Sequence, residues 1–432
     1  TYQLLLESEK SSNFLESESA KYYLEQINKQ KNIPQDEFVA FSQLKNDAQE
    51  IWLSAREAKD YQQFEPYLLK LIDTNNKMID YRQQDINRYD QMLDDYEKGL
   101  TQKQLDPFFN LLREELVPFI DEVIQAQGPK PAFLTQYVPI AKQREISKLI
   151  MEYLGYESSF GYLAETEHPF SSTFSINDTR ITTHYDEYDF TSNIFSVIHE
   201  VGHSMYNHQV NKDFEHYPLA SNMSMGMHES QSRFLENNIA RSKTFWIPIY
   251  PKLQAIIPEV LGTVSLDEFI KGINYVERGL IRTEADELTY PLHVLVRYQL
   301  EKEMAEGKTE NLNKRFADLM EEYLGLRPEN DTLGIMQDIH WSDASFGYFP
   351  TYALGSAYAA QFMEAMKKDI PLETYLLEGN IKGIFVWLEK NIHQYGGLYQ
   401  ADTILNKATG KSFDPNIFVQ YLKDKYSSLL GI

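Results

Sequence analysis

Residues that break helices are scarce in this chain, and this scarcity constrains its fold more than any other feature. Its 432 residues include 20 Gly and 17 Pro, which is below the average usage of roughly 7% and 5%. Between these breakers, apolar residues recur at steps of three and four, the period of a helix with one buried face. The stretch from Pro34 to Asp60 shows this pattern with Phe38, Phe41, Leu44, Ala48, Ile51, Trp52 and Ala55. The sequence therefore predicts a mostly helical chain.

Capping residues and Gly or Pro clusters predict where several helices begin and end. Thr101 and Gln104 have the spacing of a capping box, which predicts a helix start after Gly99. The segment 128–131, Gly-Pro-Lys-Pro, predicts a loop, and helical patterning resumes from Ile140 to Leu154. Further interruptions are expected at 327–334 and around Gly396-Gly397.

One segment differs from the helical pattern. From Ser171 to Tyr188, Ser, Thr, Phe, Ile and Tyr nearly alternate around Asn177-Asp178. Alternation with β-branched and aromatic residues is typical of strands, and Asn-Asp favours a turn. This segment predicts a β-hairpin at the edge of the helical core.

Charge and cysteine content exclude several classes of protein. The 41 Lys and Arg stand against 64 Asp and Glu, giving a net charge of -23, which argues against nucleic acid as a partner. The sequence has no uncharged apolar run of 18 residues and no basic, apolar leader, so neither membrane insertion nor secretion is expected. Because there is no Cys, a metal must be held by His and carboxylates. The absence of Cys also suits a reducing cytoplasm.

The sequence His199-Glu200-Val201-Gly202-His203 is the sharpest chemical signal. On a helix, histidines four residues apart project from one face and can bind a single ion, with Glu200 beside them as general base. The apolar residues that precede and follow the motif at helical spacing predict that it lies on a helix.

A catalytic metal site of this type needs a third protein ligand and an open position for water. Glu229 lies 30 residues after His199 in a second helix-like stretch, and it is the preferred third ligand. The neighbouring His228 and the downstream Glu236 are the alternatives. Glu236 and Asp338 are also candidates for orienting a ligand imidazole through its other nitrogen.

Six short motifs in order carry a resemblance to a known family. They are His168-Pro169-Phe170, Asp178 to Thr182, His199 to His203, His228 to Gln231, Ile281 to Leu288, and Gly334 to Trp341. Together they make the chain similar to the carboxypeptidase Taq family of metallocarboxypeptidases along essentially its whole length.

The resemblance implies a single, nearly all-helical, saddle-like catalytic domain over 1–432, with a deep groove and a small hairpin or sheet near the metal. The groove wall would span roughly 1–160, and the metal and substrate site roughly 161–360. Family members usually carry a few more N-terminal helices, which this sequence is expected to lack. The implied activity is removal of single residues from peptide C-termini with broad specificity, by a homodimer.

The resemblance also implies roles for the motif residues. His199, His203 and Glu229 are the expected ligands of one divalent ion, with zinc favoured and cobalt the alternative, and Glu200 is the expected base. The ligand types alone suit several divalent ions.

Charge that develops on the tetrahedral oxygen during hydrolysis needs a donor nearby. Tyr348, Tyr352 and His340 are the best candidates, although in a chain with 29 Tyr the alternative is an ordinary place at the edge of the core.

A carboxypeptidase must also bind the terminal carboxylate of its substrate. Arg282 is the leading candidate because a guanidinium can hold a carboxylate with two parallel hydrogen bonds; the alternative is a helical ion pair with Asp286. Arg180 is the second choice, and His168 is a candidate for the substrate pocket. Two other functions stay open: an oligopeptidase that cuts internal bonds, and an inactive helical scaffold.

Overall fold

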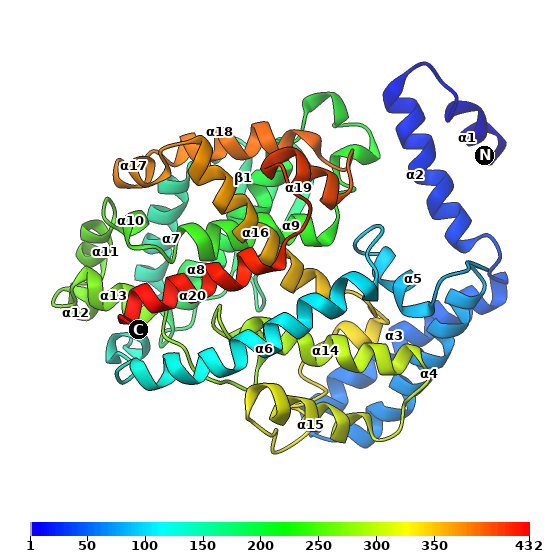
Figure 1. Ribbon diagram of the computed structural model, residues 1–432, viewed down its shortest axis with the longest axis horizontal. Helices are drawn as coiled ribbons and strands as arrows, with labels where there is room; N and C mark the ends of the chain where they lie inside the picture. The colour runs from blue at the N-terminus through cyan, green and yellow to red at the C-terminus, as the bar shows by residue number, and fades with distance from the viewer. Residues whose placement is uncertain (1) are drawn as a thin grey trace. The chain divides into compact units, whose positions relative to one another are not determined.

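The computed structural model describes residues 2–432, and the chain divides into two compact units. Unit 1 comprises the chain up to Asp121 together with Val276–Ala353, and unit 2 comprises Glu122–Tyr275 and Leu354–Ile432. In Figure 1, unit 1 includes the blue N-terminal helices and the yellow to yellow-green α14 and α15, while unit 2 includes the green and the orange to red helices. The division means that each unit is assembled from segments far apart in the sequence.

Unit 1 is helical. Its elements are α1 Tyr2–Ser8, α2 Phe14–Gln30, α3 Gln35–Ala58, α4 Tyr61–Asp80, α5 Arg88–Asp94, most of α6 Gln102–Ala126, the 3-10 turn η5 Arg282–Glu284, α14 Tyr290–Ala305, α15 Leu312–Leu324, the 3-10 turn η6 His340–Asp343, and the start of α16 Pro350–Asp369.

Unit 2 contains the strands and the remaining helices. Its first part holds η1 Ala132–Thr135, α7 Ile140–Leu154, β1 Gly161–Glu165, β2 Ser171–Ser175, β3 Asp178–Thr183, α8 Phe190–His208, η2 Lys212–Phe214, η3 Pro218–Ala220, α9 Met225–Arg233, the π-helical η4 Phe234–Ile239, α10 Lys243–Trp246, α11 Tyr250–Ile256, α12 Pro258–Leu261 and α13 Leu266–Ile273. Its second part holds the rest of α16, α17 Leu372–Leu377, α18 Ile381–Asn391, η7 His393–Tyr395, α19 Ala401–Thr409 and α20 Pro415–Leu430.

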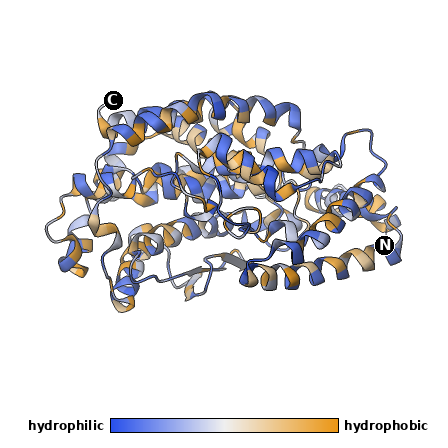
Figure 2. Cartoon of the chain, turned by 90° about the horizontal axis from the view of Figure 1, so that it is seen from below, coloured by the Kyte–Doolittle hydropathy of each residue, from blue (hydrophilic) through white to orange (hydrophobic). Residues whose placement is uncertain are grey.

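The helical periodicity of the sequence reappears as buried stripes. In α3, the fully buried positions are Leu44, Ala48, Trp52 and Ala55, at steps of three and four, while Phe38 in the first turn is 44% exposed and lies outside the stripe. Most helices in Figure 2 alternate between hydrophobic and hydrophilic residues along their length. This confirms the mostly helical fold class.

The predicted helix boundaries are also confirmed. The Gln104 side chain accepts a hydrogen bond from the Thr101 backbone N–H at 3.0 Å, directly before α6 begins. Helix α7 covers Ile140–Leu154 and ends at Gly155, whose φ of +72° is the left-handed conformation that glycine adopts at low cost. The loop at 128–131 separates α6 from η1.

The hairpin forms as predicted, but it belongs to a three-stranded sheet. Strands β2 and β3 pair antiparallel with a register shift between Thr173 and Ser175, and β1 pairs parallel to β3 in the order β1-β3-β2. The sheet packs on α8 through β3, where Thr179, Ile181 and Thr183 are fully buried. The sheet thereby supports the helix that carries the two motif histidines.

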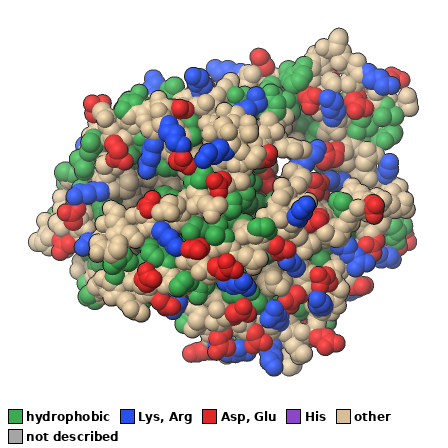
Figure 3. Space-filling model, in the orientation of Figure 1, with side chains coloured by type: hydrophobic (Ala, Val, Ile, Leu, Met, Phe, Trp, Pro, Cys, Tyr) green, Lys and Arg blue, Asp and Glu red, His purple; other side chains and the backbone are tan. Residues whose placement is uncertain are grey.

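Among the described residues, 2–432, no helix is both long enough and apolar enough to cross a membrane. In Figure 3, acidic and basic side chains are interspersed over the visible face, so the net charge of -23 is not gathered into a single patch there.

Candidate metal centre

Helices α8 and α9 come unusually close together at the metal-binding motif. A Cβ atom added to Gly202 of α8 would lie 2.6 Å from the Gln231 carbonyl oxygen and 2.6 Å from the Ser232 Cα of α9. Real Cβ atoms do not approach other atoms so closely, so the glycine inside the motif permits this packing. The close approach places α9, and Glu229 on it, opposite the two histidines.

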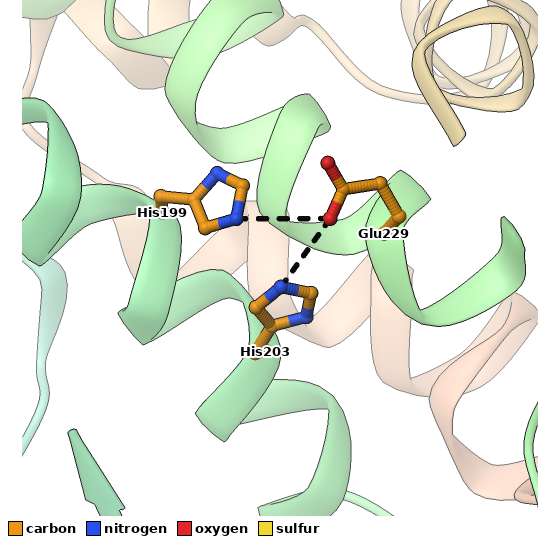
Figure 4. Close-up of side chains that lie close together, drawn as sticks. All are labelled: His199, His203 and Glu229. Carbon is orange, nitrogen blue, oxygen red and sulfur yellow. Dashed lines mark ion pairs between the residues drawn. The ribbon is translucent and has the colours of Figure 1, made fainter. Parts of the chain in front are cut away.

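His199, His203 and Glu229 converge on one point (Figure 4). The Nε2 atoms of His199 and His203 lie 3.7 and 3.5 Å from the same oxygen, Oε2 of Glu229. One candidate ligand atom from each residue lies within 4.8 Å of the others. Within the described part of the chain, this is the only group of three or more His, Cys, Asp and Glu residues that could hold a metal ion.

The spacing of these atoms fits a shared divalent ion. With metal–ligand distances of about 2.0–2.2 Å, tetrahedral geometry separates ligand atoms by about 3.3–3.6 Å, and the two His–Glu separations of 3.7 and 3.5 Å are close to that range. They are also longer than good hydrogen bonds. The donor set of two imidazoles and one carboxylate is that of a catalytic site with one open position.

The far nitrogen of His199 is held by a carboxylate. Its Nδ1 lies 2.9 Å from Oε2 of Glu236, so that carboxylate fixes the ring and leaves Nε2 directed at Glu229. Burial alone would raise the pKa of Glu236, but Arg233 and His199 outweigh it and lower that pKa. Glu236 is therefore an ionised acceptor, as expected for a residue that orients a ligand.

The far nitrogen of His203 is held by another histidine. Its Nδ1 lies 2.6 Å from Nδ1 of His228. Burial, followed by the charge of His203, lowers the pKa of His228 well below its usual range, so that ring is neutral and can accept a hydrogen bond. The Asn207 amide lies next to its other nitrogen, with Nδ2 at 3.1 Å and Oδ1 at 3.4 Å. His228 thus contacts Nδ1 of His203, while Nε2 of the same ring is directed at Glu229.

Glu229 itself is fixed by a neighbouring cation. Arg233, one turn later on α9, donates from Nε to Oε1 of Glu229 at 2.6 Å. The Ser232 hydroxyl lies 2.7 Å from the Glu229 backbone carbonyl oxygen and 3.2 Å from Oε2. Burial opposes ionisation of Glu229, but Arg233 and His199 overcome it and hold its pKa well below the usual range. The candidate third ligand is therefore negatively charged at neutral pH.

Two more residues complete this part of unit 2. Glu200 directly follows His199 in the sequence of α8, and it is 6% exposed. A Cβ added to Gly355 of α16 would lie 2.6 Å from Cγ and 2.7 Å from Cβ of Glu229. The absence of a side chain at Gly355 therefore leaves the space that the Glu229 side chain occupies.

Comparison with known proteins identifies the chain's relatives. The family model described as carboxypeptidase Taq (M32) metallopeptidase matches residues 2–426. The chain belongs to the M32 family. It is 41% identical over 404 residues to carboxypeptidase 1 of Bacillus subtilis (strain 168), covering 92% of this chain and 80% of that protein.

Two further known proteins are similar to this chain along most of its length. Thermostable carboxypeptidase 1 of Pyrococcus furiosus is 37% identical over 390 residues, covering 88% of this chain and 77% of that protein. The crystal structure of the M32 carboxypeptidase from Deinococcus radiodurans R1 has a TM-score of 0.96 and 32% identity, covering 100% of this chain and 88% of that chain. The predicted resemblance is confirmed, and so is the fold class.

In the M32 chain, Arg282 lies in unit 1 and is paired with Asp338. Its Nε and Nη2 contact Oδ1 of Asp338 at 2.9 and 2.8 Å, and its Nη1 donates to the Tyr290 hydroxyl at 3.0 Å. Asp286 instead accepts hydrogen bonds from the backbone and hydroxyl of Thr289. The helical ion pair considered as an alternative for Arg282 therefore does not form. Asp338, considered as a partner for an imidazole, pairs with arginine.

The three candidate donors of unit 1 form an aromatic group. Nε2 of His340 lies 3.0 Å from the Tyr352 hydroxyl, and the Tyr348 ring lies 5.3 Å from His340 and 5.2 Å from Tyr352. Burial, then the charge of Arg282, lowers the pKa of His340 to about 4. His340 is therefore a neutral ring at pH 7.

Arg180 and His168 are surface residues of unit 2. Arg180 on β3 forms an ion pair with Asp178 at 2.8 Å and lies over the Phe174 ring at 4.7 Å. His168 is exposed in the β1–β2 connection.

Several residues that shape these clusters were missed by the sequence analysis. Arg233 was signalled only by its spacing of four residues from Glu229, which allows a helical ion pair. Gly202 lies inside the metal-binding motif, but no sequence pattern predicted that α9 packs closely against it. Arg297 and Gly355 gave no local signal, because their roles depend on residues far away in the sequence.

Proposed function

We propose that this chain is a metal-dependent carboxypeptidase that hydrolyses single residues from the C-termini of peptides with broad specificity. The observation that carries the proposal is the convergence of His199, His203 and Glu229, with both histidines tethered through Nδ1 and directed through Nε2 at one carboxylate oxygen. Membership of the M32 family supports the same reaction.

The proposed cofactor is one divalent ion per chain, held by His199, His203 and Glu229. Zinc is the expected ion and cobalt the alternative, because imidazole and carboxylate ligands suit both. When bound, such an ion supplies a Lewis acid that polarises the scissile carbonyl and activates water.

Glu200 is the proposed general base. It follows His199 directly on α8, so it is carried by the same rigid helix as two of the ligands. Its carboxylate takes a proton from the attacking water and passes it to the nitrogen of the leaving residue, which prevents expulsion of an amide anion. Burial of Glu200 limits competition from bulk water for this proton.

Tyr348, Tyr352 and His340 are proposed as donors to the oxygen on which negative charge develops. A neutral donor that is already positioned stabilises this charge without reorganising solvent. The His340–Tyr352 hydrogen bond and the edge-to-face contact of Tyr348 with Tyr352 support positioning of this kind.

Arg282 is the proposed receptor for the terminal carboxylate of the substrate. A guanidinium has five N–H donors, and the contacts to Asp338 and Tyr290 engage three of those on Arg282. This leaves two donors for a carboxylate. Arg180 and His168 are secondary candidates for contacts with the substrate.

The remaining proposals rest on the family and on composition. We propose that residues 1–432 act as one catalytic domain, that the chain forms a homodimer, and that it works in the cytoplasm on peptides with a free C-terminus. Nucleic acid and membranes are not proposed partners.

Mass spectrometry of N-blocked peptides tests the proposed reaction. Peptides with free or amidated C-termini are incubated with protein that has been dialysed against a chelator and then supplied with zinc or cobalt. Stepwise loss of single residues from the free terminus, only with metal, is the expected result. Internal cuts that ignore amidation would instead indicate an oligopeptidase. No cleavage with either metal would favour the inactive scaffold.

A further inference from the structure

Two buried arginines of unit 1 share one carboxylate. Arg282 contacts Oδ1 of Asp338, while Arg297 contacts Oδ2 through Nε at 2.9 Å and Nη2 at 2.7 Å. Each carboxylate oxygen is therefore occupied by a different guanidinium. The three side chains are 7%, 0% and 6% exposed for Arg282, Arg297 and Asp338, so Arg297 is fully buried and the other two keep a small exposed area.

This group of three, the Arg-Asp-Arg cluster, carries two positive charges and one negative charge. Burial opposes ionisation of Asp338, but Arg282 and Arg297 outweigh it and hold its pKa well below the usual range. The adjoining His340 is neutral because its pKa is lowered to about 4. The three groups therefore carry a net charge of +1 at neutral pH. The other carboxyl that interacts with Arg297 is Glu301, whose pKa burial raises to about 7.

Arg297 belongs to the interior of unit 1. Its guanidinium lies 5.0 Å from the Phe316 ring centroid and 5.8 Å from that of Phe349, and Nη1 donates to the His293 carbonyl at 2.9 Å. A fully buried group held on all these sides does not contact a substrate. Any effect of Arg297 on substrate is therefore indirect, through its contact with Asp338 and through its charge.

We propose that Arg297 is a specificity-determining residue which, by sharing Asp338, leaves Arg282 with an unmatched charge for the free C-terminal carboxylate of a substrate. The proposal rests on the proposed carboxypeptidase function and on the role of Arg282 in it. If Asp338 belonged to Arg282 alone, the pair would be neutral. An incoming carboxylate would then be repelled by Asp338, which would offset part of its attraction to Arg282.

Four proteins that differ only in the cluster test this idea. They are the wild type with a cluster charge of +1, Arg297→Met with 0, Asp338→Asn with +2, and the double variant with +1. Methionine suits the apolar surroundings of Arg297, and asparagine keeps an acceptor for Arg282. The measurement is the ratio of kcat/KM for a peptide with a free C-terminus to kcat/KM for the same peptide with an amidated C-terminus. Where the amidated peptide is not cleaved, the background rate of the assay replaces its kcat/KM.

The ratio is expected to follow the charge of the cluster. Arg297→Met should lower it about tenfold or more, mainly through a higher KM for the free peptide, because a charged hydrogen-bonded contact is weakened. The double variant should return it to within a fewfold of the wild type, although two buried residues are changed. A purely structural role predicts that the double variant is at least as impaired as Arg297→Met, and that result would overturn the proposal.

Controls separate folding and global charge from the local effect. Arg315→Met removes one positive charge from α15, where Arg315 pairs with Glu303 in a more exposed position, and it should leave the ratio unchanged. If it lowers the ratio as Arg297→Met does, net charge alone explains the effect and the proposal fails. If Arg297→Met does not fold, Asp338→Asn carries the test: the ratio must rise, and a fall overturns the proposal.

Failure of this inference can be distinguished from failure of the proposed function. If Arg282→Ala weakens free and amidated peptides equally, the assignment of Arg282 as carboxylate receptor is wrong, and the inference falls with it. If Arg282→Ala acts only on the free peptide but Arg297→Met leaves the ratio unchanged, only the role of Arg297 is refuted.

Discussion

At the scale of the residue, Glu200 is buried on α8 beside the two histidines, and its proposed role as general base is one that they cannot take. The two flanking histidines have both ring nitrogens committed, one toward a tether and one toward Glu229. Replacing Glu200 with Gln keeps the shape but removes the proton acceptor. Turnover should fall by about two to four orders of magnitude, while metal content, measured by elemental analysis of the dialysed protein, stays at one ion per chain. Near-wild-type turnover in Glu200→Gln would exclude Glu200 as the base.

A second prediction at this scale concerns Glu301, a fully buried carboxyl on α14. It accepts hydrogen bonds from Trp341 Nε1 at 2.8 Å, from the Tyr89 hydroxyl at 2.9 Å and from the Gly347 N–H at 3.0 Å. Burial outweighs these donors and raises its pKa to about 7. The folded protein therefore keeps a proton that the unfolded chain loses near pH 4.3.

Because the folded state holds the extra proton between about pH 4.3 and 7, Glu301 makes the protein less stable as pH rises through that window, by about 4 kcal/mol in total. Glu301→Gln cannot ionise, so it should lose less thermal stability than the wild type between pH 5 and pH 8. Glu303→Gln on the same helix is the matched control, since the pKa of Glu303 is lowered. Parallel unfolding midpoints for wild type and Glu301→Gln across this range would contradict the prediction.

At the scale of the element, sequence periodicity was sufficient to predict a helix wherever one apolar face of that helix is buried. The boundaries of α3 and α7 and the hairpin of β2 and β3 followed from local patterns. Strand β1 was not foreseen, because its stability depends on parallel pairing with β3, about 18 residues away, which no local pattern encodes.

The candidate site shows the same limit. The two histidines and Glu200 were predictable because one helix carries them at a diagnostic spacing, and Glu229 followed from chemistry and the family motif. The tether of His203 by His228 and the sharing of Asp338 by Arg282 and Arg297 were not predictable. They require contacts between side chains that are 25 to 56 residues apart.

The packing of α16 against α9 gives a prediction at this scale. A methyl group at Gly355 would overlap Cγ of Glu229 at 2.6 Å, and overpacking of this kind costs about 1–3 kcal/mol. Gly355→Ala should therefore displace the Glu229 side chain and weaken metal binding about tenfold, measured by competition with a chelator. Gly128→Ala, in a loop with no neighbour within 4 Å of the added Cβ, is the control. Unchanged metal affinity in Gly355→Ala would show that the Glu229 side chain can shift without weakening metal binding, which would contradict the prediction.

At the scale of the whole molecule, the charge of -23 opposes the substrate that the proposed function requires. Every peptide with a free C-terminus carries at least one negative charge there, so the unmatched positive charge of the Arg-Asp-Arg cluster acts against the field of the rest of the protein. The two effects differ in range. The buried contact is screened little by salt, whereas the field of exposed charges falls from a reach of about 30 Å at 0.01 M to about 8 Å at 0.15 M.

This difference in range predicts how salt acts on different substrates. Raising ionic strength from 0.01 to 0.15 M should increase kcat/KM several-fold for an N-blocked peptide with several acidic residues, because long-range repulsion is screened. A peptide whose only charge is its C-terminal carboxylate should change little, since its proposed recognition by the buried cluster is screened little by salt. Sucrose in place of salt controls for solution viscosity. A fall in kcat/KM for the acidic peptide with added salt would show that local cations, and not the net charge, dominate the approach of the substrate.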